Sequence, residues 1–191
     1  MRFHVLCRAL LVLVTSGVGA RPEILVAQTP AGGDLPALVV LVRHAEPASE
    51  PADNPPLADA GTRRAQALAA TLRNAKLSAV ITSQLQRTID TARPTAAALG
   101  LTPQAVPVLD RDAHVKAVAA AVRVHAGGSV LVVSHSNIVP AIIAALGGPR
   151  LPDICETVYD HLFALVPAAG SVQLVDARYG NVSGPAGRDC M

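Results

Sequence analysis

ALVVLVRHAE, residues 37–46, is the stretch that decides the fold. Its first six residues are all apolar, three of them β-branched valines, without polar alternation, a pattern typical of a strand covered on both faces. The apolar run stops at Arg43-His44, and the proline-rich residues 47–56 that follow predict a surface loop. We therefore expect a buried strand whose end carries a guanidinium and an imidazole.

Helical and extended patterns alternate along the rest of the chain. Helices are predicted at 61–74, 87–99, 112–125 and from Ser136 or Asn137 to about 146, and extended segments at 78–82, 102–108, 129–133, 161–166 and 171–177. The last two extended segments are joined by a short turn and predict a hairpin. This order predicts an α/β fold, a three-layer α/β/α sandwich with a mainly parallel sheet and an antiparallel C-terminal hairpin.

Composition limits the classes of protein that this chain can belong to. The 191 residues are enough for one ordinary domain, and with 51% apolar and 16% charged residues the chain is too hydrophobic to be disordered. Aromatic residues make up 2% and Trp is absent, which argues against stacking platforms for single-stranded nucleic acid. The net charge of +2 without a basic run argues against binding to duplex DNA. Any anion must be caught by a local site.

The first twenty residues resemble a secretory signal. They begin with Arg2 and Arg8, continue through an apolar stretch and end in small residues, so we expect cleavage after Ala20 or, failing that, after Ala27. The apolar part is shorter than the ~20 residues that span a bilayer, although an uncleaved anchor or a buried helix is the alternative. Residues 21–36 then form a flexible lead-in, residues 37–180 the domain and residues 181–191 a tail.

The signal predicts export to the periplasm or the extracellular space, with no stable membrane insertion after cleavage. Two cysteines, Cys155 and Cys190, would remain in the mature chain. Export would place them where disulfides persist, so a bridge is one interpretation. The other is that Cys155 is a small buried hydrophobic residue and Cys190 a free residue of the tail.

Cationic and imidazole side chains follow three of the predicted strands. Arg43-His44 follows the first strand, His135 follows residues 129–133, and Arg87 comes five residues after the strand at 78–82. In a parallel sheet these ends share one edge, where ligands bind in open α/β folds. The paired N–H groups of an arginine guanidinium bind phosphoryl oxygens, and a neutral imidazole can attack phosphorus. The pattern therefore predicts a phosphoryl-transfer site.

Four segments resemble, in order, the motifs of the histidine phosphatase superfamily, also called the phosphoglycerate mutase-like fold. LVRHAE at 41–46 resembles its LVRHGE signature, and PLADAGTRRAQALA at 56–69, TSQLQRTIDTA at 82–92 and VVSHSN at 132–137 resemble its later motifs. Ala45 and Ser134 replace glycines that are common in the family. The resemblance spans residues 37 to about 147.

The resemblance implies a role for each matching residue. It places Arg43, His44, Arg87 and His135 around the phosphoryl group, with His44 as the nucleophile. Asn137 follows the second histidine and is a candidate for substrate binding. Glu46 would orient a loop or substrate, or else is a solvated surface carboxylate.

The acid that protonates the leaving oxygen is less clearly marked. In members of the family that have one, it is usually a carboxylate between the arginine motif and the second histidine. LDRDAH at 109–114 offers Asp110, which we favour, Asp112 as the second choice, and His114 as a further candidate. Without a dedicated acid, the site would suit a group that departs easily, such as phosphohistidine or an acyl phosphate.

The sequence thus predicts a metal-independent phosphatase that acts on a phosphomonoester or a phosphoramidate through a phosphohistidine at His44, with no cofactor. No HxxxH, HExxH or CxxC spacing marks a metal site, and no GxxxxGK[ST] loop marks a nucleotide site. The expected partner is a small phosphorylated substrate or a phosphoprotein, and the oligomeric state is left open. The alternatives are a phosphoglycerate mutase-type transferase, a non-catalytic phosphate-binding module, and an adaptor with chance motifs.

Overall fold

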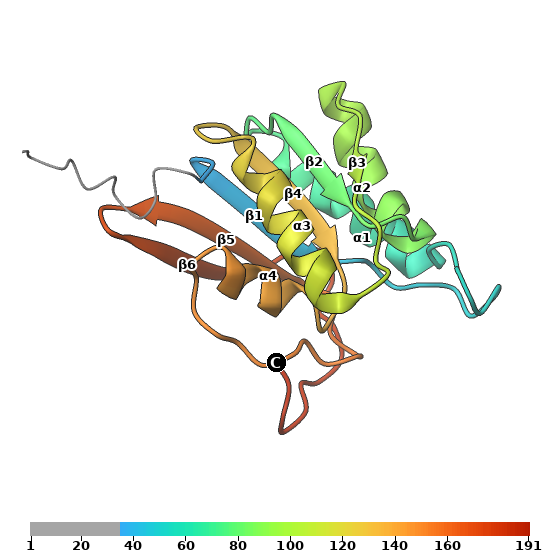
Figure 1. Ribbon diagram of the computed structural model, residues 1–191. Helices are drawn as coiled ribbons and strands as arrows, with labels where there is room; N and C mark the ends of the chain where they lie inside the picture. The colour runs from blue at the N-terminus through green and yellow to red at the C-terminus, as the bar shows by residue number, and fades with distance from the viewer. Residues whose placement is uncertain (1–34) are drawn as a thin grey trace, which may run out of the picture.

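One mixed sheet organises the protein. The computed structural model describes residues 35–191, and the expected signal and most of the lead-in lie outside them. The strand order is β3-β2-β4-β1-β5-β6 (Figure 1). The strands are β1 (Leu38–Arg43), β2 (Ala79–Thr82), β3 (Gln104–Ala105), β4 (Ser129–Ser134), β5 (His161–Ala168) and β6 (Ser171–Arg178).

Strand directions divide the sheet into two parts. β1 to β4 run parallel, with β1 and β2 on either side of β4, whereas β5 pairs antiparallel with β1 and β6 pairs antiparallel with β5. The hairpin turn at Ala169-Gly170 relies on a glycine with φ 76°, a conformation that side chains disfavour. The mainly parallel α/β fold with an antiparallel C-terminal hairpin, as predicted, is confirmed.

Helices cover both faces of the sheet. α1 (Asp59–Leu72) and α2 (Gln86–Leu99) pack on one face, and α3 (Arg111–Arg123) and α4 (Val139–Ala145) lie on the other. Each face has its own apolar core, and the central strands alternate between them: Leu41 contributes to the core under α3 and α4, and Val42 to the core under α1 and α2. Strands buried on both sides explain the unbroken apolar runs in the sequence.

Two local expectations need correction. The extended segment 102–108 forms only the two-residue strand β3. The helix predicted to start at Ser136 or Asn137 begins later, because α4 spans Val139–Ala145. Its N-cap residue is Ile138, which makes no side-chain hydrogen bond to the helix. Instead, the carbonyl of His135 accepts hydrogen bonds from the amides of Ile138 and Val139. Within residues 35–191, no helix is long and apolar enough to cross a membrane.

Candidate active site

The two central strands bring two histidines together at one edge of the sheet. β1 and β4 pair in parallel and end side by side, with Arg43 opposite Ser134. The residue that follows each strand is a histidine, so His44 and His135 are neighbours. The amide of His44 donates to the carbonyl of Ser134 at 2.8 Å, and the rings of His44 and His135 lie edge to face with centroids 5.4 Å apart. Both side chains are buried, at 6% and 7% exposure. Strand register thus sets their spacing.

His44 is held as one neutral tautomer. Its Nδ1 lies 2.9 Å from the carbonyl oxygen of Ala45, which can only accept, so Nδ1 carries the hydrogen and Nε2 keeps a lone pair. Burial, with smaller effects of the Arg43 and Arg87 charges, lowers the pKa of His44 to about 3, although the bond to Ala45 opposes the shift. The ring is therefore neutral, and nucleophilic at Nε2, at ordinary pH.

Arg87 enters the same edge from the third parallel strand. It lies in the first turn of α2, shortly after the end of β2, and borders a cavity of about 400 Å³. Other residues that line this cavity are His44, His135, Asn137, Arg111 and Glu156. Burial and the neighbouring charge of Arg43 lower the pKa of Arg87, while Glu156 opposes the shift. Two clustered cations disfavour each other unless an anion lies between them.

Arg43 is fixed by the segment that precedes β5. Its Nη1 donates to the carbonyls of Cys155, Glu156 and Val158 at 2.9–3.0 Å, and its guanidinium carbon lies 4.0 Å from the centre of the Tyr159 ring. Its Nη2 is 2.6 Å from Oε2 of Glu156. The buried Nε has no hydrogen-bond partner among the described residues. Arg43 itself does not line the cavity, so it contributes its charge from behind the histidines.

Glu156 is a pocket residue that the sequence reasoning missed. Its carboxylate accepts from Arg43 and, at 2.6 Å, from the hydroxyl of Ser136, and the side chain is mostly exposed at the cavity. The segment lies here because β5 is antiparallel to β1, so β5 starts at the edge where β1 ends. The predicted C-terminal hairpin was the signal that could have found it.

A disulfide holds this segment to the C-terminal tail. Cys155 and Cys190 are bonded, with Cα atoms 5.0 Å apart, so the structure takes the first of the two interpretations left open for the cysteines. The backbone amide of Cys155 also donates to the carbonyl of Met191, and that of Met191 to the carbonyl of Asp153. The last residues of the chain therefore hold in place the segment whose carbonyls bind Arg43.

Comparisons with known proteins agree with this geometry. Residues 39–113 match the sequence profile of the histidine phosphatase superfamily, branch 1. The comparison with curated proteins gave no match.

Solved structures of histidine phosphatases share the fold of this domain. The structure of the protein histidine phosphatase SixA complexed with tungstate is 21% identical and has a TM-score of 0.57, with 72% of this chain and 94% of that chain covered. SixA from Agrobacterium tumefaciens is 20% identical, with a TM-score of 0.53 and coverages of 74% and 97%. A mycobacterial glucosyl-3-phosphoglycerate phosphatase is 16% identical, with a TM-score of 0.55 and coverages of 75% and 98%.

The pocket between the two histidines contains some of the predicted residues and not others. Asn137 lines it together with His44, Arg87 and His135. Asp110, our favoured acid, does not: its carboxylate accepts from the amide of Ala113 and caps α3. Asp112, the second choice, points instead to Arg111.

The remaining acid candidate is buried rather than placed in the pocket. His114 is 2% exposed, and its Nδ1 lies 3.1 Å from the carbonyl of Pro107. Within residues 35–191, no three His, Cys, Asp or Glu side chains are grouped as metal ligands.

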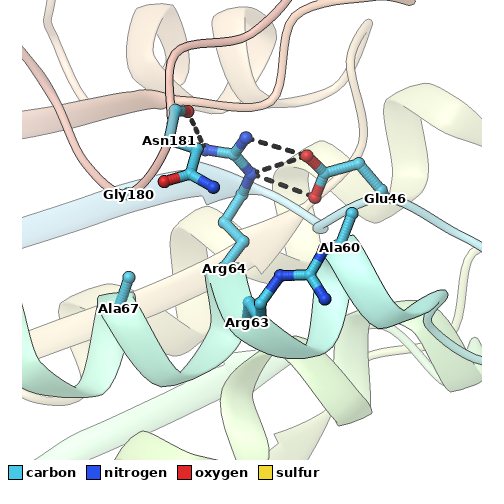
Figure 2. A pocket seen from close by; sticks show the side chains of 7 residues that line it. All are labelled: Glu46, Ala60, Arg63, Arg64, Ala67, Gly180 and Asn181. Carbon is cyan, nitrogen blue, oxygen red and sulfur yellow. Dashed lines mark hydrogen bonds and ion pairs between the residues drawn. The ribbon is translucent and has the colours of Figure 1, made fainter.

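Glu46 lies in a separate pocket. Figure 2 shows its carboxylate facing Arg64 of α1, whose Nε and Nη2 donate to it at 2.8–3.0 Å. Arg64 is buried and also donates to the carbonyls of Tyr179 and Asn181. A Cβ on Gly61 would lie 2.2 Å from the carbonyl oxygen of Glu46, so only glycine permits this approach. Glu46 therefore ties the loop after β1 to α1 and to the end of the hairpin.

Proposed function

We propose that this protein is a metal-independent phosphatase in which His44 forms a phosphohistidine intermediate. The observation that carries the proposal is the tautomer of His44. Because Nδ1 donates to the carbonyl of Ala45, the lone pair of Nε2 is available next to Arg87 and His135. The attacking atom is therefore supplied by the chain itself.

The reaction runs in two displacements at phosphorus. Nε2 of His44 forms a P–N bond as the bond from phosphorus to the leaving group breaks. Water then breaks the P–N bond and releases inorganic phosphate. Arg87, which lines the cavity, can donate to the phosphoryl oxygens, on which negative charge is spread in the transition state, and the positive charge of Arg43 lies close behind it.

The arrangement of carboxylates favours a substrate whose leaving group departs easily. Asp110 caps α3 and does not line the cavity. Glu156 does line it, but both of its oxygens accept hydrogen bonds, from Arg43 and Ser136. We therefore place a phosphoramidate such as phosphohistidine ahead of a simple phosphomonoester. The similarity in fold to a structure described as a protein histidine phosphatase supports the same choice.

The experiment is to trap the intermediate. Brief incubation with a phosphohistidine peptide or a phosphomonoester, each carrying labelled phosphorus, should label the protein with a bond that survives alkali and breaks in acid. His44→Ala should abolish both the label and turnover. His125→Ala, which changes a histidine just after α3, is the matched control and should behave as wild type. The mechanism is wrong if chelators stop turnover while His44→Ala retains it, and a site that binds phosphate without turnover would be a binding module.

We also propose that the protein is exported. The signal-like residues 1–20 and the bond between Cys155 and Cys190 support this, since disulfides persist in oxidising compartments. Mass spectrometry of protein from native cells should find a mature chain that starts at Arg21 or Gln28. An intact Met1 in a cytosolic fraction would contradict export.

A further inference from the structure

His135 is bound on its inner side by two buried hydroxyls. Its Nε2 lies 3.1 Å from Oγ of Ser83, and that Oγ lies 2.9 Å from Oγ1 of Thr88. Ser83 follows β2 directly, Thr88 lies in the first turns of α2, and both are fully buried. Neither residue is among those that line the cavity, so neither touches a ligand there directly.

The direction of each bond follows from counting hydrogens. Oγ1 of Thr88 lies 2.8 Å from the carbonyl oxygen of Leu85 and 3.1 Å from that of Ser83. Carbonyl oxygens only accept, so the single hydroxyl hydrogen of Thr88 is used there, and Thr88 must accept from Ser83. The only hydroxyl hydrogen of Ser83 is then used on Thr88.

The imidazole must therefore donate to Ser83. With no hydrogen left to offer, Oγ of Ser83 can only accept from Nε2 of His135, and it also accepts from the backbone amide of Leu85 at 3.2 Å. A neutral imidazole has one N–H, so Nδ1 of His135 has a lone pair. Nδ1 has no hydrogen-bond partner among the described residues, and His135 lines the cavity. This lone pair repels a phosphoryl oxygen unless a proton lies between them.

We propose that Ser83 and Thr88 are positioning residues that fix His135 as the Nε2–H tautomer, so that the site binds a phosphoryl dianion together with one proton, held at Nδ1 of His135. The proposal rests on the proposed function only in taking this pocket as the phosphoryl site. It deepens that function by stating which protonation state of the complex the site accepts.

The charges that face His135 agree with this coupling. Without an anion, burial and then the nearby His44, Arg87, His114 and Arg43 lower the pKa of His135 to about 3. Among residues 35–191, Glu156 is the one carboxylate that lines the cavity, and it is engaged by Arg43 and Ser136. A dianion among these cations reverses the sign of the local potential and favours the imidazolium. Proton uptake on binding is the measurable consequence.

The first test reads the tautomer without any ligand. In protein with ¹⁵N-labelled histidine, the nitrogen shifts of His135 should report a hydrogen on Nε2 and a lone pair on Nδ1. Thr88→Val removes the acceptor of the Ser83 hydrogen, which then turns to Nε2 and moves His135 toward the Nδ1–H form. Thr88→Ser should restore the wild-type spectrum. Thr95→Val is the matched control, because Thr95 is a buried threonine of the same helix whose hydroxyl has no partner among the described residues.

The second test measures the proton that accompanies the anion. Tungstate stays a dianion above neutral pH, so its affinity for the wild type should fall as the pH rises from about 7 to 9, by up to about tenfold per pH unit. Thr88→Val presents an Nδ1–H without taking up a proton, so its affinity should change less with pH. Thr95→Val should follow the wild type.

The two tests separate this inference from the proposed function. An Nδ1–H tautomer in the wild type, or equal pH slopes for wild type and Thr88→Val, overturns the inference. If tungstate does not bind the wild type at all, the phosphoryl site and the coupled proton are refuted, while the tautomer spectrum still decides the role of the two hydroxyls.

Discussion

Mild acid should destabilise this protein through the two histidines of the site. In the unfolded chain a histidine takes up a proton as the pH falls below about 6.5. In the folded protein the pKa of His44 and of His135 is lowered to about 3, mainly by burial. Above about pH 6.5 both states hold neutral rings, so these histidines do not change stability. As the pH falls from 6.5 toward 3, the unfolded chain binds protons that the folded protein does not, and the free energy of unfolding falls.

The size of the effect follows from the two pKa values. Between about pH 7.5 and 5.5, each histidine should lower the free energy of unfolding by about 1.4 kcal/mol, or about 3 kcal/mol for the pair. That is a large part of the 5–15 kcal/mol that is typical of a domain. Burial also lowers the pKa of His114, which adds to the loss in the same direction.

Urea unfolding at the two pH values, with the disulfide intact, measures the difference. Circular dichroism is the suitable probe because the chain has no Trp. The double variant His44→Gln, His135→Asn should lose most of the pH dependence, whereas His125→Asn, outside the cavity, should keep it. A free energy of unfolding that does not change between the two pH values would show that these rings are not held neutral by burial, and the argument for a neutral nucleophile would fail with it.

Three further predictions concern the surroundings of the site. Arg87→Ala should slow turnover about 100-fold, since the loss of a charge-assisted clamp costs about 3 kcal/mol in the transition state, and Arg87→Lys should restore it only in part; steady-state kinetics decide. Reducing the bond between Cys155 and Cys190 should lower the free energy of unfolding by about 3–4 kcal/mol, and two thiols labelled in denatured, unreduced protein would exclude the bond. Gly61→Ala should destabilise the fold by about 1–3 kcal/mol because its Cβ would meet the backbone of Glu46, and an unchanged melting temperature would contradict this contact.

The edge that gathers His44 and His135 could be predicted because local pattern and topology agree there. Each histidine follows an unbroken apolar strand, and parallel strands must end at the same edge. Arg87 was harder to place by spacing alone, because it lies within α2 rather than at a strand end. The resemblance of residues 82–92 to a family motif placed Arg87 in the site, which the helical pattern alone did not.

Glu156 and Asp110 show where sequence reasoning fell short. The search for site residues considered only the carboxyl ends of the parallel strands. The segment that contains Glu156 precedes β5, and it reaches the same edge because β5 runs antiparallel to β1. Asp110 fits the preference for aspartate at a helix N-cap, and that local role accounts for its position without any reaction. A carboxylate in a suitable interval of sequence can serve a helix rather than a substrate.

The way in which Arg43 is held has a consequence for engineering. Its Nη1 is bound by main-chain oxygens of residues 155, 156 and 158, and every amino acid supplies such an oxygen. These three bonds would therefore survive a change of side chain at residue 156, whereas Cys155 is held in the disulfide and Val158 is buried in the core. Glu156 also faces the cavity, so substitutions at this position should alter which ligands fit there, at the cost of one bond to Nη2 of Arg43 while the three bonds to Nη1 remain.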